Sequence, residues 1–298
     1  MKTYRCLGYV ALIILMLFIS RPGYCEERFQ LAYQPAVGDQ YRTKIMMKYQ
    51  IRQDTIDIGL ALGYGLEYEV LAIDKKKTVT SRITFQAMLM RLNGPFGVMT
   101  NFDSTDPFEE MTPENLIYAT LIGSSFDYKT NAVGKVLAVK GIDELIKRID
   151  REVPDSAQKK ETIKQLRSQL KQGSMIGPTD NLSLYPEHPV MVGESWQALH
   201  ATNSNGIMMM SEDRYEIVER RDGIVKLKIT SELKPGMTNG PKNAKLEGKQ
   251  WGEVEIIERN GWVNRMNLQQ AITGTVTGQA GAEPQSFTMN GAITLEPF

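Results

Sequence analysis

The chain has 298 residues, of which 42% are hydrophobic, so it can build a substantial core and intrinsic disorder is excluded. Lys and Arg together number 35, as do Asp and Glu, and this zero net charge provides no electrostatic case for nucleic-acid binding. Two histidines and two cysteines are too few for the usual zinc, haem or iron–sulfur ligand sets. We therefore assign no catalytic, cofactor-binding or metal-ligating residue and expect no cofactor.

The first 25 residues have the pattern of a secretory signal peptide. Lys2 and Arg5 precede an apolar run from Cys6 to Ile19, and a helix-breaking pair follows at Pro22 and Gly23. The run is shorter than the roughly 20 residues that a membrane-spanning helix needs. We expect cleavage after Cys25, a periplasmic or extracellular location, and no transmembrane segment in the mature chain.

Cys25 leaves one alternative open, a lipidated N-terminus of the bacterial lipoprotein type. That pattern has Leu three residues before the cysteine and a small residue directly before it, where this chain has Pro22 and Tyr24. Both departures favour simple cleavage. The mature chain would then have no cysteine, and neither a disulfide nor a thiol nucleophile.

The remaining chain contains two stretches with similar order. Val37-Gly38-Asp39-Gln40-Tyr41 and Val192-Gly193-Glu194-Ser195-Trp196 each place a glycine and an acid before an aromatic residue that opens an extended segment. Each is followed by a β-hairpin pattern, one beginning at Tyr68 and one at Tyr215. A third pair of hairpins turns at 131–134 and at Asn260-Gly261. The pattern predicts an internal duplication of a strand meander.

Helices are expected mainly between the two copies. Thr112-Pro113-Glu114 is a helix start, so a short helix is predicted at 113–122 within the first copy. The apolar spacing of Ile142, Leu145, Ile146, Ile149 and Val153 predicts a helix that ends before Pro154. A further helix is predicted from Asp155, as its cap, to Gln172.

The fold class follows from these elements: α+β and mostly antiparallel, with duplicated meanders forming curved sheets or an open barrel and two to three helices between the copies. The predicted division is a signal peptide at 1–25, a first β-rich copy at 26–141, helices and a linker at 142–189, and a second β-rich copy at 190–298.

The chain resembles a family of uncharacterised secreted bacterial proteins, a domain of unknown function with a Gly-acid-x-aromatic strand start. The residues that carry the resemblance are 37–41, 134–141, 185–190 and 192–196. The resemblance implies no activity. At the level of architecture only, the chain is also similar to periplasmic lipid and lipoprotein carriers, in which a curved antiparallel sheet holds acyl chains.

Methionines are the candidate ligand-lining residues. Met88 and Met90 would face one side of a strand together, as would Met208 and Met210. Flexible thioethers adapt to irregular apolar ligands, although they also fill ordinary cores. A copper(I) site from Met208, Met210 and His200 lacks the usual repeated Met and His spacing.

Other polar clusters have simpler explanations. Asp103, Asp106, Glu109 and Glu110 lack the spacing of a calcium loop and indicate a solvated acidic loop. Neither histidine, His188 nor His200, has a partner in sequence that would hold it as a general base. Ser195 is not followed by the glycine that a nucleophile elbow requires, and Lys75-Lys76-Lys77 indicates a charged turn.

The sequence therefore favours a secreted, non-enzymatic binding protein with an apolar small molecule or lipid as its ligand. The alternative is a structural or protein-interaction module of the bacterial envelope, with an envelope protein as partner. An enzyme is the least supported class, because enzymes need positioned acid, base or nucleophile groups.

Overall fold

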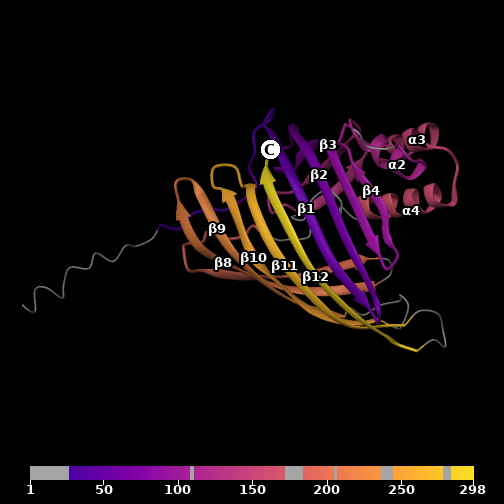
Figure 1. Cartoon of the computed structure of the whole chain (residues 1–298). Coiled ribbons are helices and arrows are strands. Elements are labelled where there is room, and N and C mark those ends of the chain that lie inside the picture. Colours follow the sequence, from indigo (N-terminus) through magenta and orange to yellow (C-terminus); the bar gives the residue numbers. More distant parts are fainter. Residues whose placement is uncertain (1–26, 108–110, 172–183, 205–206, 236–243, 278–282) are drawn as a thin grey trace, which may run out of the picture.

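The computed structural model describes residues 27–107, 111–171, 184–204, 207–235, 244–277 and 283–298. Within these ranges, twelve antiparallel strands form one large open sheet and three helices pack beside it (Figure 1). The expectation of a mostly antiparallel β protein is confirmed, and the strands join in a single sheet. The strands are β1 (Gln40–Gln53), β2 (Ile56–Ile73), β3 (Val79–Gly94), β4 (Gly97–Asp103), β5 (Ser125–Thr130), β6 (Val136–Lys140), β7 (Ser195–Ser204), β8 (Ile207–Arg221), β9 (Ile224–Pro235), β10 (Ala244–Ile257), β11 (Trp262–Val276) and β12 (Gln285–Pro297).

The strand order joins the two halves of the chain at its middle. It runs β6-β5-β3-β2-β1-β12-β11-β10-β9-β8-β7, and β4 pairs with β3 outside this path. The first half proceeds outward from β1, the chain then passes to the opposite edge at β7, and the second half returns inward to β12. β1 and β12 pair along their length, from Thr43 opposite Pro297 to Gln53 opposite Phe287.

One face of the sheet carries most of the core, and we call it the inner face. Alternate residues of each strand point to it, for example Ile45 in β1 and Leu227 and Ile229 in β9, which are almost completely buried. The register carries this face across the joint, because Ile45 pairs with Leu295, which in turn pairs with Met266. The opposite, outer face is rich in charged side chains.

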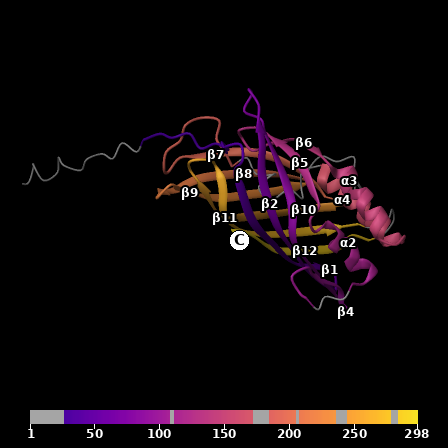
Figure 2. The same cartoon turned by 90° about the horizontal axis from the view of Figure 1, so that it is seen from above.

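The helices cover the inner face only on the side of β2 to β6. They are α2 (Pro113–Leu121), α3 (Ile142–Glu152) and α4 (Ala157–Lys171), and they gather at one side of the sheet (Figure 2). Buried Leu121 of α2 and Ile149 of α3 belong to the same core cluster as Phe85 of the sheet. The three helices confirm the predicted helical segments to within a few residues, and the predicted end at Gln172 lies outside the described residues.

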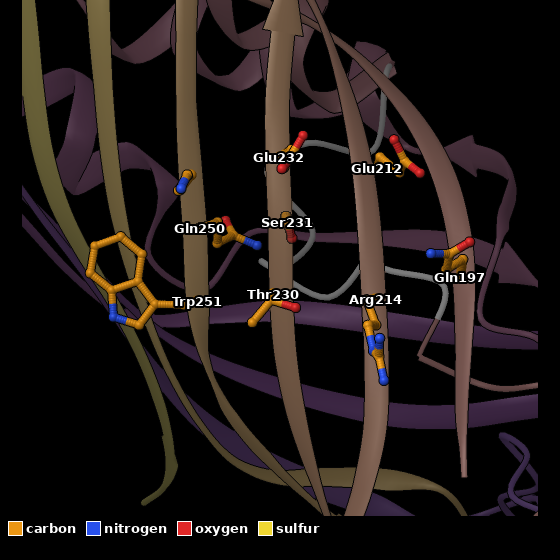
Figure 3. Close-up of a pocket in the computed structure, with 9 residues that line it drawn as sticks. Gln197, Glu212, Arg214, Thr230, Ser231, Glu232, Gln250 and Trp251 are labelled. Carbon is orange, nitrogen blue, oxygen red and sulfur yellow. The ribbon is translucent and has the colours of Figure 1, made fainter.

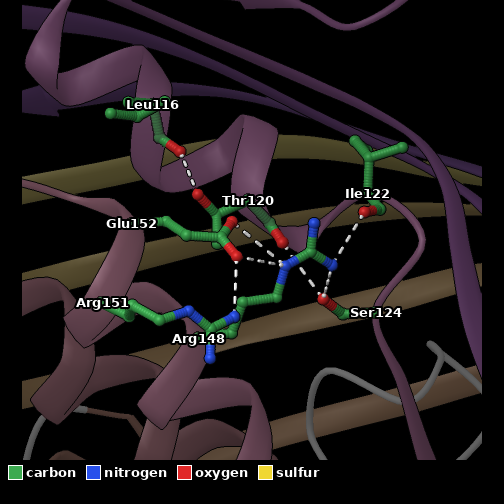
Figure 4. Close-up of polar contacts among 7 residues, drawn as sticks. All are labelled: Leu116, Thr120, Ile122, Ser124, Arg148, Arg151 and Glu152. Atoms are coloured by element: carbon green, nitrogen blue, oxygen red, sulfur yellow. Dashed lines mark hydrogen bonds and ion pairs between the residues drawn. The ribbon is translucent and has the colours of Figure 1, made fainter.

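A polar joint locks α2 against α3. The Arg148 guanidinium donates hydrogen bonds to the backbone oxygen of Ile122 and to Ser124 Oγ, at 3.3 and 2.8 Å, and also to Glu152 one helical turn ahead (Figure 4). The Ile122 carbonyl lies just beyond the end of α2, where helices leave carbonyl groups unsatisfied. Arg148 therefore fixes the angle at which the two helices meet.

The start of α4 corrects one prediction. Ser156, and not Asp155, provides the cap: its Oγ accepts the Lys159 backbone N–H at 3.0 Å. Asp155 instead pairs with the Lys159 ammonium at 3.0 Å. Lys159 draws Asp155 away from the cap because its nearly buried ammonium also donates to the Asp150 and Val153 carbonyls at the end of α3.

The two similar strand starts have the same local structure. Gly38 N–H donates to the Val70 carbonyl, and Val70 N–H donates back to Asp39, while Gly193, Ile217 and Glu194 repeat this exchange. Tyr41 pairs with Tyr68 as Trp196 pairs with Tyr215. This agreement is local, and the duplication of the whole meander stays a prediction.

Two connecting segments cross the inner side at one end of the sheet. Tyr33 N–H donates to Ala132 in the β5–β6 turn, and Gln34 N–H donates to Asn260 in the β10–β11 turn. The ring of Tyr33 contacts Tyr185 and Trp262, and Trp262 stacks on Tyr41 at 4.0 Å between ring centroids. We call this the plugged end, because residues 27–36 and 184–190 connect turns that are far apart in the sheet.

Candidate functional site

The apolar inner face continues beyond the part that the helices and the plugged end cover. Towards the opposite end of the strands, its hydrophobic side chains change from buried to partly exposed. In register, Leu60 pairs with Leu92, Ile51 with Ile58 and Ile272 with Met289. We call this surface the trough, and its members are Ile51, Ile58, Leu60, Leu92, Ile272, Phe287 and Met289.

The trough is continuous with the core and offers only apolar contacts. Between trough and core, the Tyr49 ring lies directly over Gly291, where a Cβ atom would be 2.4 Å from the ring. Burial raises the pKa of the Tyr49 hydroxyl to about 12. This face can therefore accommodate a long hydrocarbon surface without a charged side chain among the trough residues.

The structure separates the candidate methionines. Met88 pairs with Tyr64, and Met90 with Leu62, on the inner face, where Met88 is buried and Met90 partly exposed beside the trough. Met210 pairs with Ala201 and Lys234, in the register of the outer face. The side chain of Met208 lies outside the described residues.

Strand alternation could have indicated which methionine of the triple run belongs to the inner face. Tyr215 and Ile217 are fully buried there, and counting back by twos reaches Met209. Met209 is partly exposed. The inner-face methionine at this site is therefore one that the sequence pattern did not single out.

A row of polar side chains crosses the inner face on neighbouring strands. Asp213 of β8 pairs with Ser231 of β9, Ser231 with Gln250 of β10, and Gln250 with Gln270 of β11. Asp213 is only 1% exposed and accepts hydrogen bonds from the hydroxyls of Ser211 and Tyr215. Isolated polar residues in strands give no local signal, so this polar row is not predictable from the sequence pattern.

Ser231 is the member of the polar row whose hydroxyl can still form a hydrogen bond with a ligand. It is 4% exposed, and its Oγ has no hydrogen-bond partner in the part of the chain that the structure describes. A buried hydroxyl without a partner has a free-energy cost, so a ligand or water at this place would be stabilised. Gln270 Nε2 donates to Gln250 Oε1 at 2.5 Å, so these two amides hold each other in place.

The outer face of β7 to β10 carries a shallow groove of about 510 Å³, and its lining also includes Ser231 and Gln250 of the polar row (Figure 3). Trp251, 45% exposed, stands at one side of it, and Arg214 and Lys249 contribute cations. Glu212 and Glu232 add two carboxylates. Its mixture of an indole with both signs of charge suits hydrogen bonding and stacking more than enclosure of a hydrocarbon.

The remaining sequence candidates do not converge on a site. Asp103 Oδ1 accepts from the backbone and hydroxyl of Thr105, which makes a closed turn, and Glu109 and Glu110 lie outside the described residues. His188 and Ser195 are exposed, and the side chain of His200 is outside the described part. Across the described ranges, no three His, Cys, Asp or Glu side chains gather in a way that could hold a metal ion.

The predicted signal peptide cannot be placed, because residues 1–26 lie outside the described residues. Among the helices of the described chain, none combines the length and the apolar character needed to cross a bilayer.

Comparison with known proteins gives one family and one informative fold. A family model for a family of unknown function, DUF6263, matches residues 76–263. The search of curated proteins found no match. A structure described as lipid–protein interactions in lipovitellin is similar over 89% of this chain, with a TM-score of 0.50 and 10% sequence identity.

This chain spans 25% of the lipovitellin chain, and at that identity the similarity concerns the fold alone. A structure of OccK5 (OpdH) from Pseudomonas aeruginosa aligns over 87% of this chain and 98% of its own, with 8% identity and a TM-score of 0.18. So low a score carries no argument.

Proposed function

The chain belongs to DUF6263, a family of unknown function, so we infer its function from the geometry. We propose that this chain is a non-enzymatic protein that binds a lipid-like ligand on its inner face. The observation that carries this proposal is the trough. Its apolar side chains continue the core surface but remain partly exposed. Exposed contiguous apolar surface in a folded protein marks a binding site more often than a structural accident.

The fold of lipovitellin supports the same function. The structure with which this chain shares its fold is described by its lipid–protein interactions. In this chain a large sheet offers one apolar face. A chain of about 16 carbons gains roughly 12 kcal/mol on full burial, at about 0.8 kcal/mol per methylene, so such a ligand requires few polar contacts.

The polar row indicates that the ligand has a polar end group. Ser231, Asp213 and Gln250 lie on the same face as the trough residue Ile272, which occupies the next inner-face position after Gln270. An acyl chain along the trough would bring a polar end group within reach of these side chains. The ligand that fits best is therefore an amphiphile with one hydrogen-bonding end.

Fluorescent fatty-acid titration tests the proposal with a matched pair of variants. Leu60→Gln places an amide in the trough, and Ala61→Gln places the same amide on the opposite face of the same strand. Leu60→Gln should weaken binding about tenfold, since burying an unpaired amide costs at least about 1.4 kcal/mol. Ala61→Gln should bind like the wild type.

Two results would contradict the lipid function. One is the absence of saturable binding by the wild-type protein, and the other is equal affinity of the two variants. Native mass spectrometry of the purified protein provides an independent check, because a retained amphiphile should appear as an added mass that organic extraction removes.

A protein-interaction module of the envelope remains the second candidate, and the outer groove favours it. Trp and Arg are the side chains that most often carry binding energy at protein interfaces, and here Trp251 and Arg214 flank Thr230 in register. Trp251→Ala should abolish capture of an envelope protein if this candidate is correct, and leave fatty-acid binding unchanged.

Location is part of the proposal. Lys2, Arg5 and the apolar run to Ile19 support export, with cleavage after Cys25. The N-terminal sequence of the exported protein tests this, because a start at Glu26 agrees with it and a lipidated Cys25 does not.

A further inference from the structure

The tip of the β3–β4 hairpin is the most exposed apolar feature among the described residues. Phe96 is completely exposed, Val98 is 71% exposed and Met99 66%. No charged residue occurs between Leu92 and Thr100. An exposed aromatic ring therefore lies near two further exposed hydrophobic side chains.

The tip is a tight turn whose backbone conformation is restricted at two positions. Gly94 pairs with Gly97 around a two-residue turn of Pro95 and Phe96. The proline ring restricts its own φ, and Gly97 adopts a φ of +107°, which favours glycine. β4 pairs only with β3 and lies outside the main strand path, so the β3–β4 turn lies at an edge of the sheet.

The tip lies at the open end of the trough. Gly59 of β2 pairs with Asn93, so the β1–β2 turn and the β3–β4 turn reach the same end of the sheet. Ile56, the first residue of β2, adds a further 45% exposed side chain there. Leu92, next to Asn93, is itself a trough residue, so the trough reaches the strand end that carries the tip.

We propose that Phe96, Val98 and Met99 insert into the interfacial region of a lipid bilayer and dock the open end of the trough against it. Three side chains on a narrow turn offer much less surface than the roughly 800 Å² per partner of a stable protein interface. They suit a fluid apolar phase, where a small wedge is enough for reversible attachment.

The charges near the tip identify the kind of membrane surface. At the neighbouring turn Arg52 is paired with Asp57, and Arg91 lies 3.7 Å from Asp103. No cluster of unpaired cations surrounds the tip in the described chain. Docking therefore depends on apolar insertion, so zwitterionic lipid is sufficient and salt has little effect.

Co-sedimentation with vesicles of pure phosphatidylcholine tests this inference. The wild-type protein should bind, and its partition coefficient should change less than about twofold between low and high salt. The double variant Phe96→Ser/Met99→Ser should lose about tenfold or more, because both insertions are lost. The control Val37→Ser/Leu137→Ser removes two side chains that are 62% and 53% exposed elsewhere, and should bind normally.

A second readout follows the tip itself. Phe96→Trp should show a blue-shifted emission on these vesicles, measured as the difference from the wild-type spectrum with its three tryptophans. Absence of vesicle binding by the wild type, equal binding by the tip variant, equal loss in the control, or an unshifted Phe96→Trp emission would each overturn the inference.

Fatty-acid binding in vesicle-free buffer separates this inference from the proposed function. The tip variant should retain it, because Phe96 and Met99 are not trough residues. If the wild type binds vesicles but no fatty acid, the lipid-ligand proposal fails while docking stands. If it binds fatty acid but no vesicles, docking fails alone.

Discussion

At the scale of single residues, the plugged end depends on Gly261. The Asn260-Gly261 pair was predicted as a turn, and Gly261 has the expected positive φ of +71°. A Cβ atom on Gly261 would lie 2.1 Å from the Ala32 carbonyl oxygen, so the crossing segment needs this glycine for space as well. The Tyr185 hydroxyl also donates to the Gly261 carbonyl.

Gly261→Ala should destabilise the protein more than Gly223→Ala. Both glycines have a positive φ, but nothing lies within 4 Å of a Cβ atom on Gly223. Gly223→Ala should therefore cost only the conformational strain, about 1 kcal/mol, and Gly261→Ala at least about 2 kcal/mol because the Ala32 backbone must also move. Urea unfolding of the two variants measures the difference, and equal free energies would mean that residues 27–36 do not pack on this turn.

At the scale of elements, the helices show which features a local sequence pattern can predict. The spacing from Ile142 to Ile149 predicted α3 correctly, and its four apolar residues are buried. The predicted cap residue of α4 was wrong by one position, because Asp155 forms an ion pair with Lys159 instead of capping the helix. A cap is local, but the competing carbonyls of α3 become available only when the two helices meet.

Lys159→Met should loosen the corner between α3 and α4. The change leaves the Asp150 and Val153 carbonyls without their charged donor, and we expect a loss of about 1.5 to 3 kcal/mol of unfolding free energy. The exposed Lys164→Met change is the control.

Lys159→Met should also change the pKa of Asp155. Lys159 lowers the pKa of Asp155, so the ionised carboxylate contributes its stabilising effect above the ordinary value near 3.8 and loses it as the pH falls through the lowered value. In Lys159→Met the pKa of Asp155, followed by carboxyl NMR, should rise towards 3.8. An unchanged pKa would contradict the ion pair.

At the scale of the whole molecule, the β1–β12 joint makes one inner face from two halves. Core residues on both sides of the joint, such as Ile45 and Leu295, pair directly. We therefore expect the described sheet to unfold in one cooperative step, although the sequence pattern divides the chain into two β-rich copies.

Two spectroscopic signals can test this cooperativity, because they come from different parts of the chain. All three tryptophans, Trp196, Trp251 and Trp262, lie in the second half, whereas the described helices lie between residues 113 and 171. Fluorescence and the helical circular dichroism should change at the same urea concentration. Separate midpoints would indicate independent domains.

The sequence by itself determined the local features of this protein: the strand alternation, the hairpin turns at Asn131 and Asn260, the α3 stripe and the shared face of Met88 and Met90. Each depends on residues within one turn or one strand, where backbone geometry sets the periodicity. Tertiary structure alone decided that β1 pairs with β12, that Asp213, Ser231 and Gln250 form one row, and that the trough ends at the Phe96 tip. These depend on which strands become neighbours, and that choice is made by the burial of a common core between residues far apart in the chain.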